Sequence, residues 1–190
     1  MIIALTGTPG TGKTSVASIV EKQYEISIIN LHQFAKDNHL IDGFDTQRNS
    51  DIIDIDLLNK EIQQQIKTDG PILLDGHLSH LLSCVSKIIV LRCHPEILQK
   101  RLQIKKWHKE KIQENIHAEI LDVIISETVN NHSIENIFEL DTSQKNTMDI
   151  AKIIIQLIQT DFNDSETYTL GKIDWSELIL SDKFSWSNDR

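Results

Sequence analysis

The sequence has few of the features that mark secreted, membrane or zinc-binding proteins. It contains only two cysteines, Cys84 and Cys93, and no C-x-x-C pair. This argues against a disulfide framework or a cysteine zinc site and favours reduced thiols in the core. No apolar run approaches the roughly 20 residues that cross a bilayer, and the first residues, MIIALTG, lack the basic region of a secretory signal. We therefore expect a soluble, cytoplasmic protein that does not associate with membranes.

Positive charge is also scarce. The formal net charge is -9, because 28 acidic residues outnumber 19 basic ones. Such a surface repels phosphates on average, so we expect no strong direct binding of nucleic acid, while a local basic patch or a basic protein partner stays possible. A chain of 190 residues with 39% apolar content suits one compact domain, with at most an appendage.

Five short apolar runs alternate with segments of helical periodicity. Each run is apolar on both faces, which is typical of buried parallel strands. Residues 41–51, between two helical segments, are interpreted as a loop. A short helix from Pro95 to about Leu102 precedes one long amphipathic helix, on which isoleucines from Ile112 to Ile124 recur every fourth residue. The expected fold class is α/β, with a five-stranded parallel sheet and helices on both faces. The five runs are 2–6, 26–31, 71–75, 87–93 and 134–140.

The character of the sequence changes near residue 160. An apolar stripe from Ile150 to Ile158 predicts a last helix that covers one face of the sheet and closes a domain of residues 1–160. Residues 161–190 are acidic and aromatic, with Trp175 and Trp186, and are interpreted as a C-terminal extension. Its side chains could dock on a basic, hydrophobic partner. Folding back on its own body, or on a second copy of the chain, is an equal alternative.

The strongest motif is GTPGTGKT, residues 7–14. It fits the pattern G-x-x-x-x-G-K-[ST] and lies between a predicted strand and a predicted helix, which is the context that this phosphate-binding loop (P-loop) requires. Glycines let backbone N–H groups and the helix N-terminus face an anion, Lys13 can reach terminal phosphates, and Thr14 offers a hydroxyl to Mg²⁺. The alternative is a glycine-rich turn before a structural helix. The predicted donor-binding residues are Gly10, Thr11, Gly12, Lys13, Thr14 and Ser15.

The segment LLDGHLSH, residues 73–80, places an acid, a glycine and a histidine at the end of a predicted buried strand. Parallel strands end at the same edge of a sheet, so Asp75 would lie beside the P-loop, where Mg²⁺ or its water shell needs a carboxylate. His77 would project toward the reacting phosphates as a hydrogen-bond donor or an orienting base. The alternatives are a structural histidine, or a metal pair of His77 with His80 that lacks a convincing third ligand.

Two weaker signals concern metal and nucleobase. Acids between residues 42 and 56 suit turns and a helix N-cap better than a metal cluster. The late strands are not followed by an N-K-x-D-like segment of the kind that recognises guanine, so an adenine nucleotide is the predicted donor. The acids are Asp42, Asp45, Asp54 and Asp56.

Four ordered motifs resemble the adenylate kinase isoenzyme 6 family, small P-loop kinases that are also implicated in maturation of the small ribosomal subunit. In ordinary adenylate kinases the acid and glycine after the third strand lead into an aromatic residue, a proline and an arginine, whereas here His77 follows, as in the D-x-H signature of this family. The resemblance spans residues 1–159. The motifs are GTPGTGKT, AKDNHLIDGFD (35–45) with DIIDIDLL (51–58), LLDGH (73–77), and VLRCHPEILQKRL with KIQENIHAEI (90–120).

The resemblance implies a P-loop nucleoside-monophosphate-kinase fold that transfers the γ-phosphoryl group of ATP, with Mg²⁺, to AMP. It implies that residues about 30–55 form a nucleoside-monophosphate (NMP)-binding insertion and that residues about 104–114 form a short mobile lid. It also implies a weaker ATPase activity tied to ribosome assembly, with a ribosomal protein of the small subunit as partner. The alternatives are an ATP-driven assembly factor with little kinase activity, and a kinase for another small metabolite.

Basic residues near the predicted lid could stabilise the negative charge that phosphoryl transfer spreads over oxygens. Arg101 and Lys105 are the foremost candidates, although a solvated basic helix end is the plain alternative. Lys105 and Lys36 stand where family members carry arginine, and because lysine offers a point charge instead of a planar fork, we expect looser phosphate contacts and a larger share of ATPase activity. By the same resemblance, Thr142 and Ser143 border the nucleobase, with a plain loop as alternative. The predicted catalytic residues are Lys13, Asp75, His77, Arg101 and Lys105, with Thr14 and Asp75 at the metal.

Overall fold

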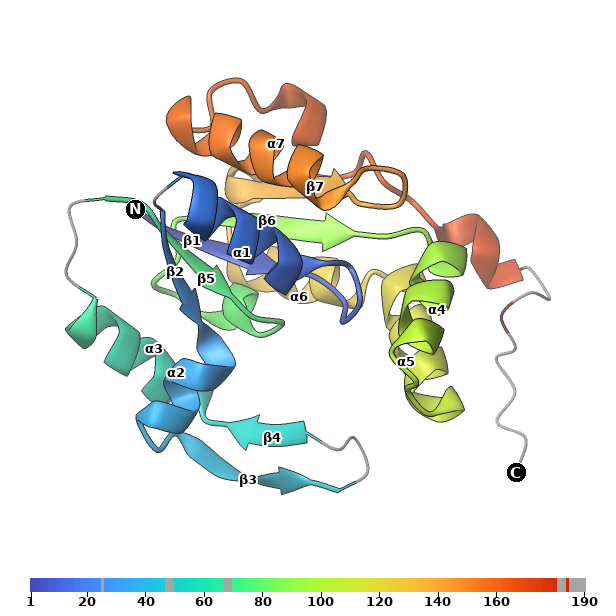
Figure 1. Ribbon diagram of the computed structural model, residues 1–190, viewed down its shortest axis with the longest axis horizontal. Coiled ribbons are helices and arrows are strands. Elements are labelled where there is room, and N and C mark those ends of the chain that lie inside the picture. The colour runs from blue at the N-terminus through green and yellow to red at the C-terminus, as the bar shows by residue number, and fades with distance from the viewer. Residues whose placement is uncertain (25, 47–49, 67–69, 181–183, 185–190) are drawn as a thin grey trace.

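The computed structural model describes residues 1–24, 26–46, 50–66, 70–180 and 184. Five parallel strands form one sheet in the order β2-β5-β1-β6-β7 (Figure 1), which confirms the predicted fold class. The register aligns Leu5 and Asn30 with Asp75, so β1, β2 and β5 end at one edge. The strands are β1 (Ile2–Thr6), β2 (Ser27–Asn30), β5 (Ile72–Asp75), β6 (Lys87–Arg92) and β7 (Ile137–Asp141).

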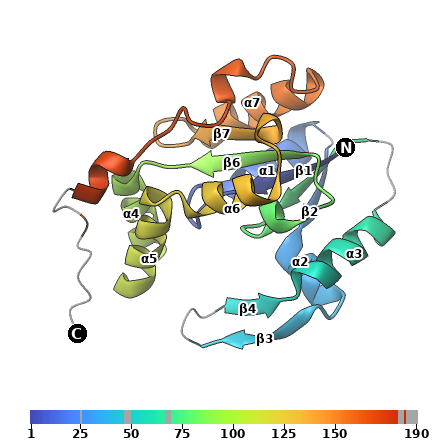
Figure 2. The ribbon, with the colours of Figure 1, turned by 180° about the vertical axis from the view of Figure 1, so that it is seen from behind.

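Helices cover both faces of the sheet because successive strand residues point to opposite sides. Ile3 and Leu5 pack under α1 (Lys13–Tyr24) and α7 (Thr147–Gln159) in one core cluster, whereas Ala4 belongs to a second cluster on the other face. Figure 2 shows that second face, which carries α6. The remaining helices are α2 (Leu31–Asp37), α3 (Ile55–Gln65), α4 (Pro95–Ile104), α5 (Lys109–Ile120), α6 (Val123–Asn131), and the short 3₁₀ turns η1 (Ser79–Leu81), η2 (Ile134–Asn136), η3 (Glu166–Tyr168) and η4 (Ser176–Leu180).

The segment interpreted as a loop is a β-hairpin. Strands β3 (Ile41–Asp45) and β4 (Ser50–Ile53) pair antiparallel, with Phe44 opposite Asp51, and residues 47–49 between them lie outside the described part. The expectation was wrong because the acids and the glycine suggested turns, whereas cross-strand pairing satisfies the backbone of this segment. Among the four acids, Asp54 caps α3 as predicted, since its side chain accepts a hydrogen bond from Leu57 N.

The single long helix expected after Pro95 is also interrupted. Asp122 has a left-handed backbone (φ 53°) between the end of α5 and the start of α6. An aspartate adopts this conformation more readily than most residues, and the Asp122 carboxylate here accepts a hydrogen bond from the Arg92 guanidinium. The every-fourth-residue isoleucine pattern could not reveal this break, because the pattern continues on both sides of it.

The described part of the extension packs against the domain. Phe162 is 5% exposed and its ring centroid lies 4.8 Å from that of Phe138, while Gly171 N donates to Glu139 Oε2 at 2.7 Å. Trp175 packs edge-on against His94, with ring centroids 5.0 Å apart. The described part of the extension thus folds back on the chain's own body, which is one of the predicted arrangements. The predicted contact residue Trp186 lies outside the described residues.

Two further expectations concern the cysteines and the membrane. Cys84 and Cys93 carry free thiols, as predicted; Cys93 is buried, and burial raises its pKa to about 11. Among the described residues, no helix combines the length and the apolar character needed to span a bilayer.

Candidate active site

The P-loop joins β1 to α1 and is held tightly between neighbouring elements. At Gly7 (φ 134°) a Cβ atom would come within 2.3 Å of the Leu91 carbonyl oxygen on β6. At Gly10 (φ 100°) it would come within 2.8 Å of the side chains of Leu98 and Leu102 on α4. Positive φ and close contact both require glycine at these positions, so the sequence of the motif sets the path of the loop.

Lys13 lies inside this curve. Its Nζ donates to the carbonyl oxygens of Gly7 at 2.6 Å and Thr8 at 3.1 Å, and the residue is 9% exposed. Burial lowers the pKa of Lys13 to about 8, against the opposing effect of nearby Asp75 and Glu119. The ammonium group is therefore weakly hydrated. It can form strong, short-range interactions with the oxygens of a terminal phosphate.

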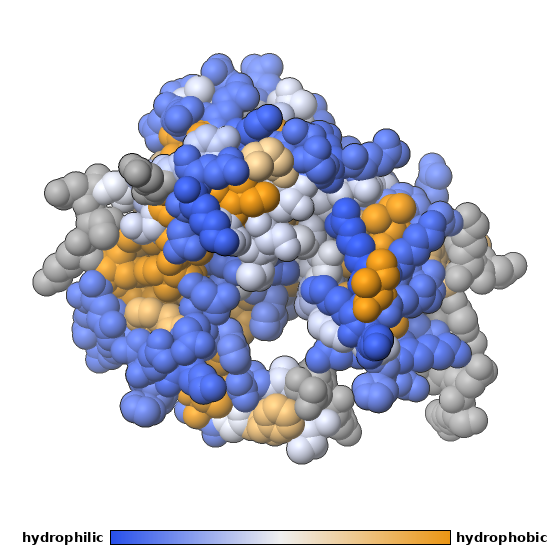
Figure 3. Space-filling view, in the orientation of Figure 1, coloured by the Kyte–Doolittle hydropathy of each residue, from blue (hydrophilic) through white to orange (hydrophobic). Residues whose placement is uncertain are grey.

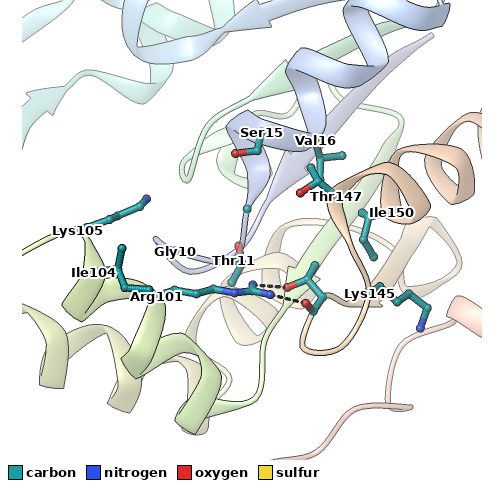
Figure 4. Close-up of a pocket in the computed structure, with 12 residues that line it drawn as sticks. Gly10, Thr11, Ser15, Val16, Arg101, Ile104, Lys105, Lys145, Thr147 and Ile150 are labelled. Atoms are coloured by element: carbon teal, nitrogen blue, oxygen red, sulfur yellow. Dashed lines mark hydrogen bonds between the residues drawn. The ribbon is translucent and has the colours of Figure 1, made fainter.

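Two cavities open on either side of Lys105 and the P-loop. The first, about 330 Å³, is the Arg101 pocket (Figure 4), and the second, about 280 Å³, is the Asp75 pocket. The Arg101 pocket is lined by Gly10, Thr11, Gly12, Ser15, Val16, Arg101, Ile104, Lys105, Thr142, Lys145, Thr147 and Ile150. The Asp75 pocket is lined by Pro9, Gly10, Gly12, Lys13, Thr14, Ser15, Asn30, His32, Asp75, Gly76, His77, Lys105 and Trp107.

The end of β5 brings an acid to the P-loop, as the sequence indicated. Asp75 is 3% exposed and lines the same pocket as Lys13 and Thr14. Gly76 is needed for close packing, because a Cβ atom there would lie 3.0 Å from Cβ of Leu31 on α2. The structure thus brings together the acid, the lysine and the threonine hydroxyl that the two motifs supplied separately.

His77 and His80 occupy different environments. His77 lines the Asp75 pocket, and desolvation, followed by the charge of Lys13, lowers its pKa to about 4, so the imidazole is neutral at pH 7. His80 is 1% exposed; its Nδ1 lies 3.0 Å from Thr6 Oγ1 and its Nε2 lies 3.0 Å from Glu127 Oε2. His80 is therefore part of the packed interior. Within the described residues, no group of three or more acids, histidines or cysteines is arranged to hold a metal ion.

Arg101 lines its pocket together with P-loop residues, but its guanidinium is bonded to Thr142. Its guanidinium donates to Thr142 Oγ1 at 3.0 Å and to the Thr142 carbonyl oxygen at 2.6 Å, as Figure 4 shows. Thr142 lines the same pocket, and its place beside a nucleobase stays a prediction. A role for Arg101 at the reacting phosphates stays a prediction, and it requires Arg101 to exchange its Thr142 contacts for phosphate oxygens.

Two predicted residues are not brought to these pockets. The hydroxyl of Ser143 accepts a hydrogen bond from His94 N at 2.7 Å, and Ser143 lines a different cavity, beside Trp175. Lys36 is exposed on α2 and lines neither the Arg101 pocket nor the Asp75 pocket. Their assignment came from resemblance alone, and in this conformation their side chains serve other contacts or face solvent.

Sequence reasoning also missed several pocket residues. Asn30 ends β2 as Asp75 ends β5. Because parallel strands end at the same edge of a sheet, the position of Asn30 at a strand end could have placed it beside Asp75. Trp107 lies in the predicted lid segment, and Lys111 Nζ stands 4.8 Å from its ring centroid. His32 lies within the predicted NMP-binding region, and Lys145 closely follows the predicted nucleobase residues Thr142 and Ser143; for Thr147 we find no comparable signal in the sequence.

Comparison with known proteins shows the family of the chain. A model of the AAA domain family matches residues 3–122. The "Putative adenylate kinase" of Pyrococcus abyssi is 37% identical over 179 residues, covering 94% of this chain and 93% of the relative. The protein of the same name from Archaeoglobus fulgidus is 38% identical over 180 residues, covering 94% of each chain.

A solved structure shares the fold at low sequence identity. Shikimate kinase from Acinetobacter baumannii, in complex with shikimate, superposes with a TM-score of 0.57 at 18% identity, covering 84% of this chain and 93% of that one. This likeness concerns the P-loop kinase fold alone. With a family model over most of its length and relatives well above 30% identity, the chain belongs to the AAA domain family and to the same family as these two archaeal proteins.

Proposed function

We propose that the protein is an adenylate kinase that transfers the γ-phosphoryl group of Mg-ATP to AMP. The observation that carries this proposal is the meeting of Lys13, Asp75 and His77 in one pocket at the mouth of the P-loop. The names of the archaeal relatives supply the acceptor, because the pocket by itself indicates only phosphoryl transfer. The cytoplasm, where adenine nucleotides are exchanged, is the expected location.

The two pockets suggest how donor and acceptor lie. The Arg101 pocket has the apolar walls and the threonine hydroxyls that suit an adenine and its ribose, so it would hold the donor nucleoside. The triphosphate would follow the P-loop, with Lys13 at its β- and γ-phosphates. The acceptor phosphate would enter from the Asp75 pocket, lined by Asn30 and His32. Gly10, Gly12, Ser15 and Lys105 border both pockets, at the expected point of transfer.

Magnesium fits this arrangement. Thr14 offers a hydroxyl and Asp75 a buried carboxylate on the same pocket wall, and oxygen donors of this kind are the ligands that Mg²⁺ prefers, directly or through water. The ion would neutralise charge on the phosphates. Neutral His77 could donate or accept one hydrogen bond at the acceptor side, and Lys105 could stabilise charge on the transferred group.

Closure of the molecule around both nucleotides is part of the proposal. Figure 3 shows an open gap between the hairpin β3–β4 and the α4–α5 pair. We assign residues 30–55 to acceptor binding and residues 104–114 to a lid, so that their approach would exclude water and favour transfer to AMP over hydrolysis. Trp107 and Lys105, at the turn between α4 and α5, would then move toward the phosphates.

A second candidate is an ATPase that acts in assembly of the small ribosomal subunit, with a ribosomal protein as partner. The placement of the cations favours it: Lys36 stands outside both pockets and Arg101 is bound to Thr142, so the acceptor side has few cations for a second phosphate. The extension also keeps Leu180 91% exposed, and this side chain could contact a partner. Unchanged affinity for that partner after deletion of residues 161–190 would refute the docking role of the extension.

A coupled assay separates these functions. ADP formation would be measured with Mg-ATP plus AMP, CMP, dAMP or no acceptor, alongside phosphate release. An adenylate kinase produces ADP faster with AMP than with CMP and releases little phosphate. Equal phosphate release with and without AMP would favour the ATPase, and absence of turnover with every nucleotide would overturn both and leave a kinase for another metabolite.

A further inference from the structure

A buried carboxylate from α5 contacts the P-loop. Glu119 is 3% exposed, and its Oε2 accepts a hydrogen bond from the Thr8 hydroxyl at 2.5 Å, across 111 positions of sequence. Its Oε1 accepts from Arg92 Nε at 2.8 Å and from Cys93 N at 3.0 Å. Both oxygens are therefore engaged, one with the phosphate loop and the other with the end of β6.

Thr8 is the residue through which this contact reaches Lys13. The Thr8 carbonyl oxygen accepts hydrogen bonds from Lys13 Nζ at 3.1 Å, from Thr11 N at 3.2 Å and from Thr11 Oγ1 at 2.9 Å. Thr8 is 1% exposed. Because the hydroxyl and the carbonyl belong to the same residue, a bond that fixes the side chain also restricts the direction of the carbonyl, and with it the place of the lysine ammonium.

Arg92 keeps Glu119 in this position. The guanidinium, 2% exposed, donates to Glu139 Oε1 at 2.7 Å, to the Asp122 carboxylate and to the Glu119 carbonyl oxygen at 3.3 Å, in addition to the Glu119 side chain. A planar guanidinium with several acceptors has little rotational freedom. Rotation of the Glu119 carboxylate away from Thr8 would therefore also disturb its bond with Arg92. Breaking a buried ion pair costs more free energy than breaking one that is exposed to solvent.

We propose that Glu119 is a positioning residue of the nucleotide site, which holds the Thr8 carbonyl toward Lys13 through the Thr8 hydroxyl. The inference rests on the proposed function in one respect, namely that the P-loop binds a triphosphate. It also links the P-loop to the lid, because Glu119 lies on the helix that begins within the lid segment.

The test is the affinity of the full-length chain for Mg-ATP, measured by calorimetry at neutral pH. Thr8→Val should bind about tenfold more weakly, as loss of one charge-assisted hydrogen bond allows. Thr8→Ser, which keeps the hydroxyl, should restore most of the affinity. Glu119→Gln should weaken binding by a similar factor. Thr128→Val, a buried threonine whose hydroxyl bonds only its own helix at Ile124 O among the described contacts, is the control and should bind normally.

The outcomes are distinguishable. A wild-type chain without affinity for Mg-ATP overturns the proposed function itself. A wild-type chain that binds, with Thr8→Val or Glu119→Gln at wild-type affinity, overturns the positioning role alone. If thermal unfolding shows that Glu119→Gln does not fold, Thr8→Val decides, because it leaves the Arg92 cluster intact.

Discussion

Asn30 and Asp75 are register partners at the carboxyl ends of β2 and β5, and Asn30 Nδ2 donates to Asp75 Oδ2 at 3.3 Å. The pair stands on the wall of the pocket that also contains Lys13. An amide that bonds one carboxylate oxygen leaves the other oxygen available and fixes its direction. The acid is thereby held in place on the wall of the Asp75 pocket.

Asp75→Asn tests the proposed magnesium role. The substitution keeps the size of the side chain and removes its charge, so phosphoryl transfer should fall by roughly a hundredfold or more, as for loss of one group that stabilises a transition state. The measurement is turnover as a function of Mg²⁺ concentration. Asp56→Asn, in the exposed first turn of α3, should retain the wild-type rate. An unaltered rate and Mg²⁺ requirement in Asp75→Asn would exclude this acid from the metal site.

The lowered pKa of Lys13 should be visible in the stability of the nucleotide-free chain. The folded-state pKa is about 8 and the ordinary value is 10.5, so between these pH values the unfolded chain binds more protons than the folded one. Stability from this residue therefore rises with pH across that window.

The contribution of Lys13 is isolated by comparing the unfolding free energies of wild type and Lys13→Met, measured with urea at a series of pH values. The wild type should gain stability relative to Lys13→Met from pH about 8 to 10.5. The buried Cys93 thiol also titrates in an overlapping range, because its pKa is raised from 9.0 to about 11. Its contribution to the stability of the folded chain falls as the pH rises. Both chains share this contribution, so the difference between them reports Lys13. A constant difference would show that Lys13 is not desolvated as described.

Two P-loop glycines should respond differently to alanine. Gly10 and Gly12 both have positive φ, 100° and 105°, so either substitution strains the backbone by about 1–2 kcal/mol. A Cβ atom at Gly10 also meets Leu98 and Leu102 at 2.8 Å, whereas at Gly12 it meets nothing within 4 Å. Gly10→Ala should therefore cost about 1–3 kcal/mol more unfolding free energy than Gly12→Ala, by overpacking. Equal losses would mean that α4 moves aside without cost.

The extension should contribute to folding stability. Phe162→Ala removes a ring that is 5% exposed and packs on Phe138, so the free energy of unfolding should fall by about 3–5 kcal/mol. Leu180→Ala changes a side chain that is 91% exposed and should be close to neutral. Chemical denaturation of both variants gives the comparison. A negligible effect of Phe162→Ala would separate the extension from the core.

Lys105→Arg should raise the rate of transfer to AMP. Lys105 borders both pockets, and a guanidinium there can bind two phosphate oxygens where the ammonium supplies a point charge. One additional charge-assisted hydrogen bond in the transition state permits an increase of roughly tenfold in kcat. Lys106→Arg, next to it but outside both pockets, is the matched control. A higher rate in the control, or a lower one in Lys105→Arg, would contradict the placement.

Parts of the site could be predicted because their signals are local. The glycines, Lys13 and Thr14 occur within one strand–loop–helix unit, and Asp75 follows a buried strand, so sheet topology alone brings them to one edge. The hairpin at 41–53 and the break at Asp122 were not predicted. Their conformations depend on cross-strand pairing and on the guanidinium of Arg92, and periodicity reports neither.

Local residue types and spacings specify the phosphate loop, the five strands and the sheet edge at which acid and lysine meet. Three other contacts could be found only in the folded chain: Glu119 with Thr8, Arg101 with Thr142, and the extension with Phe138. These contacts join residues far apart in the chain, and each exists only when packing has brought its two partners together and removed competing water.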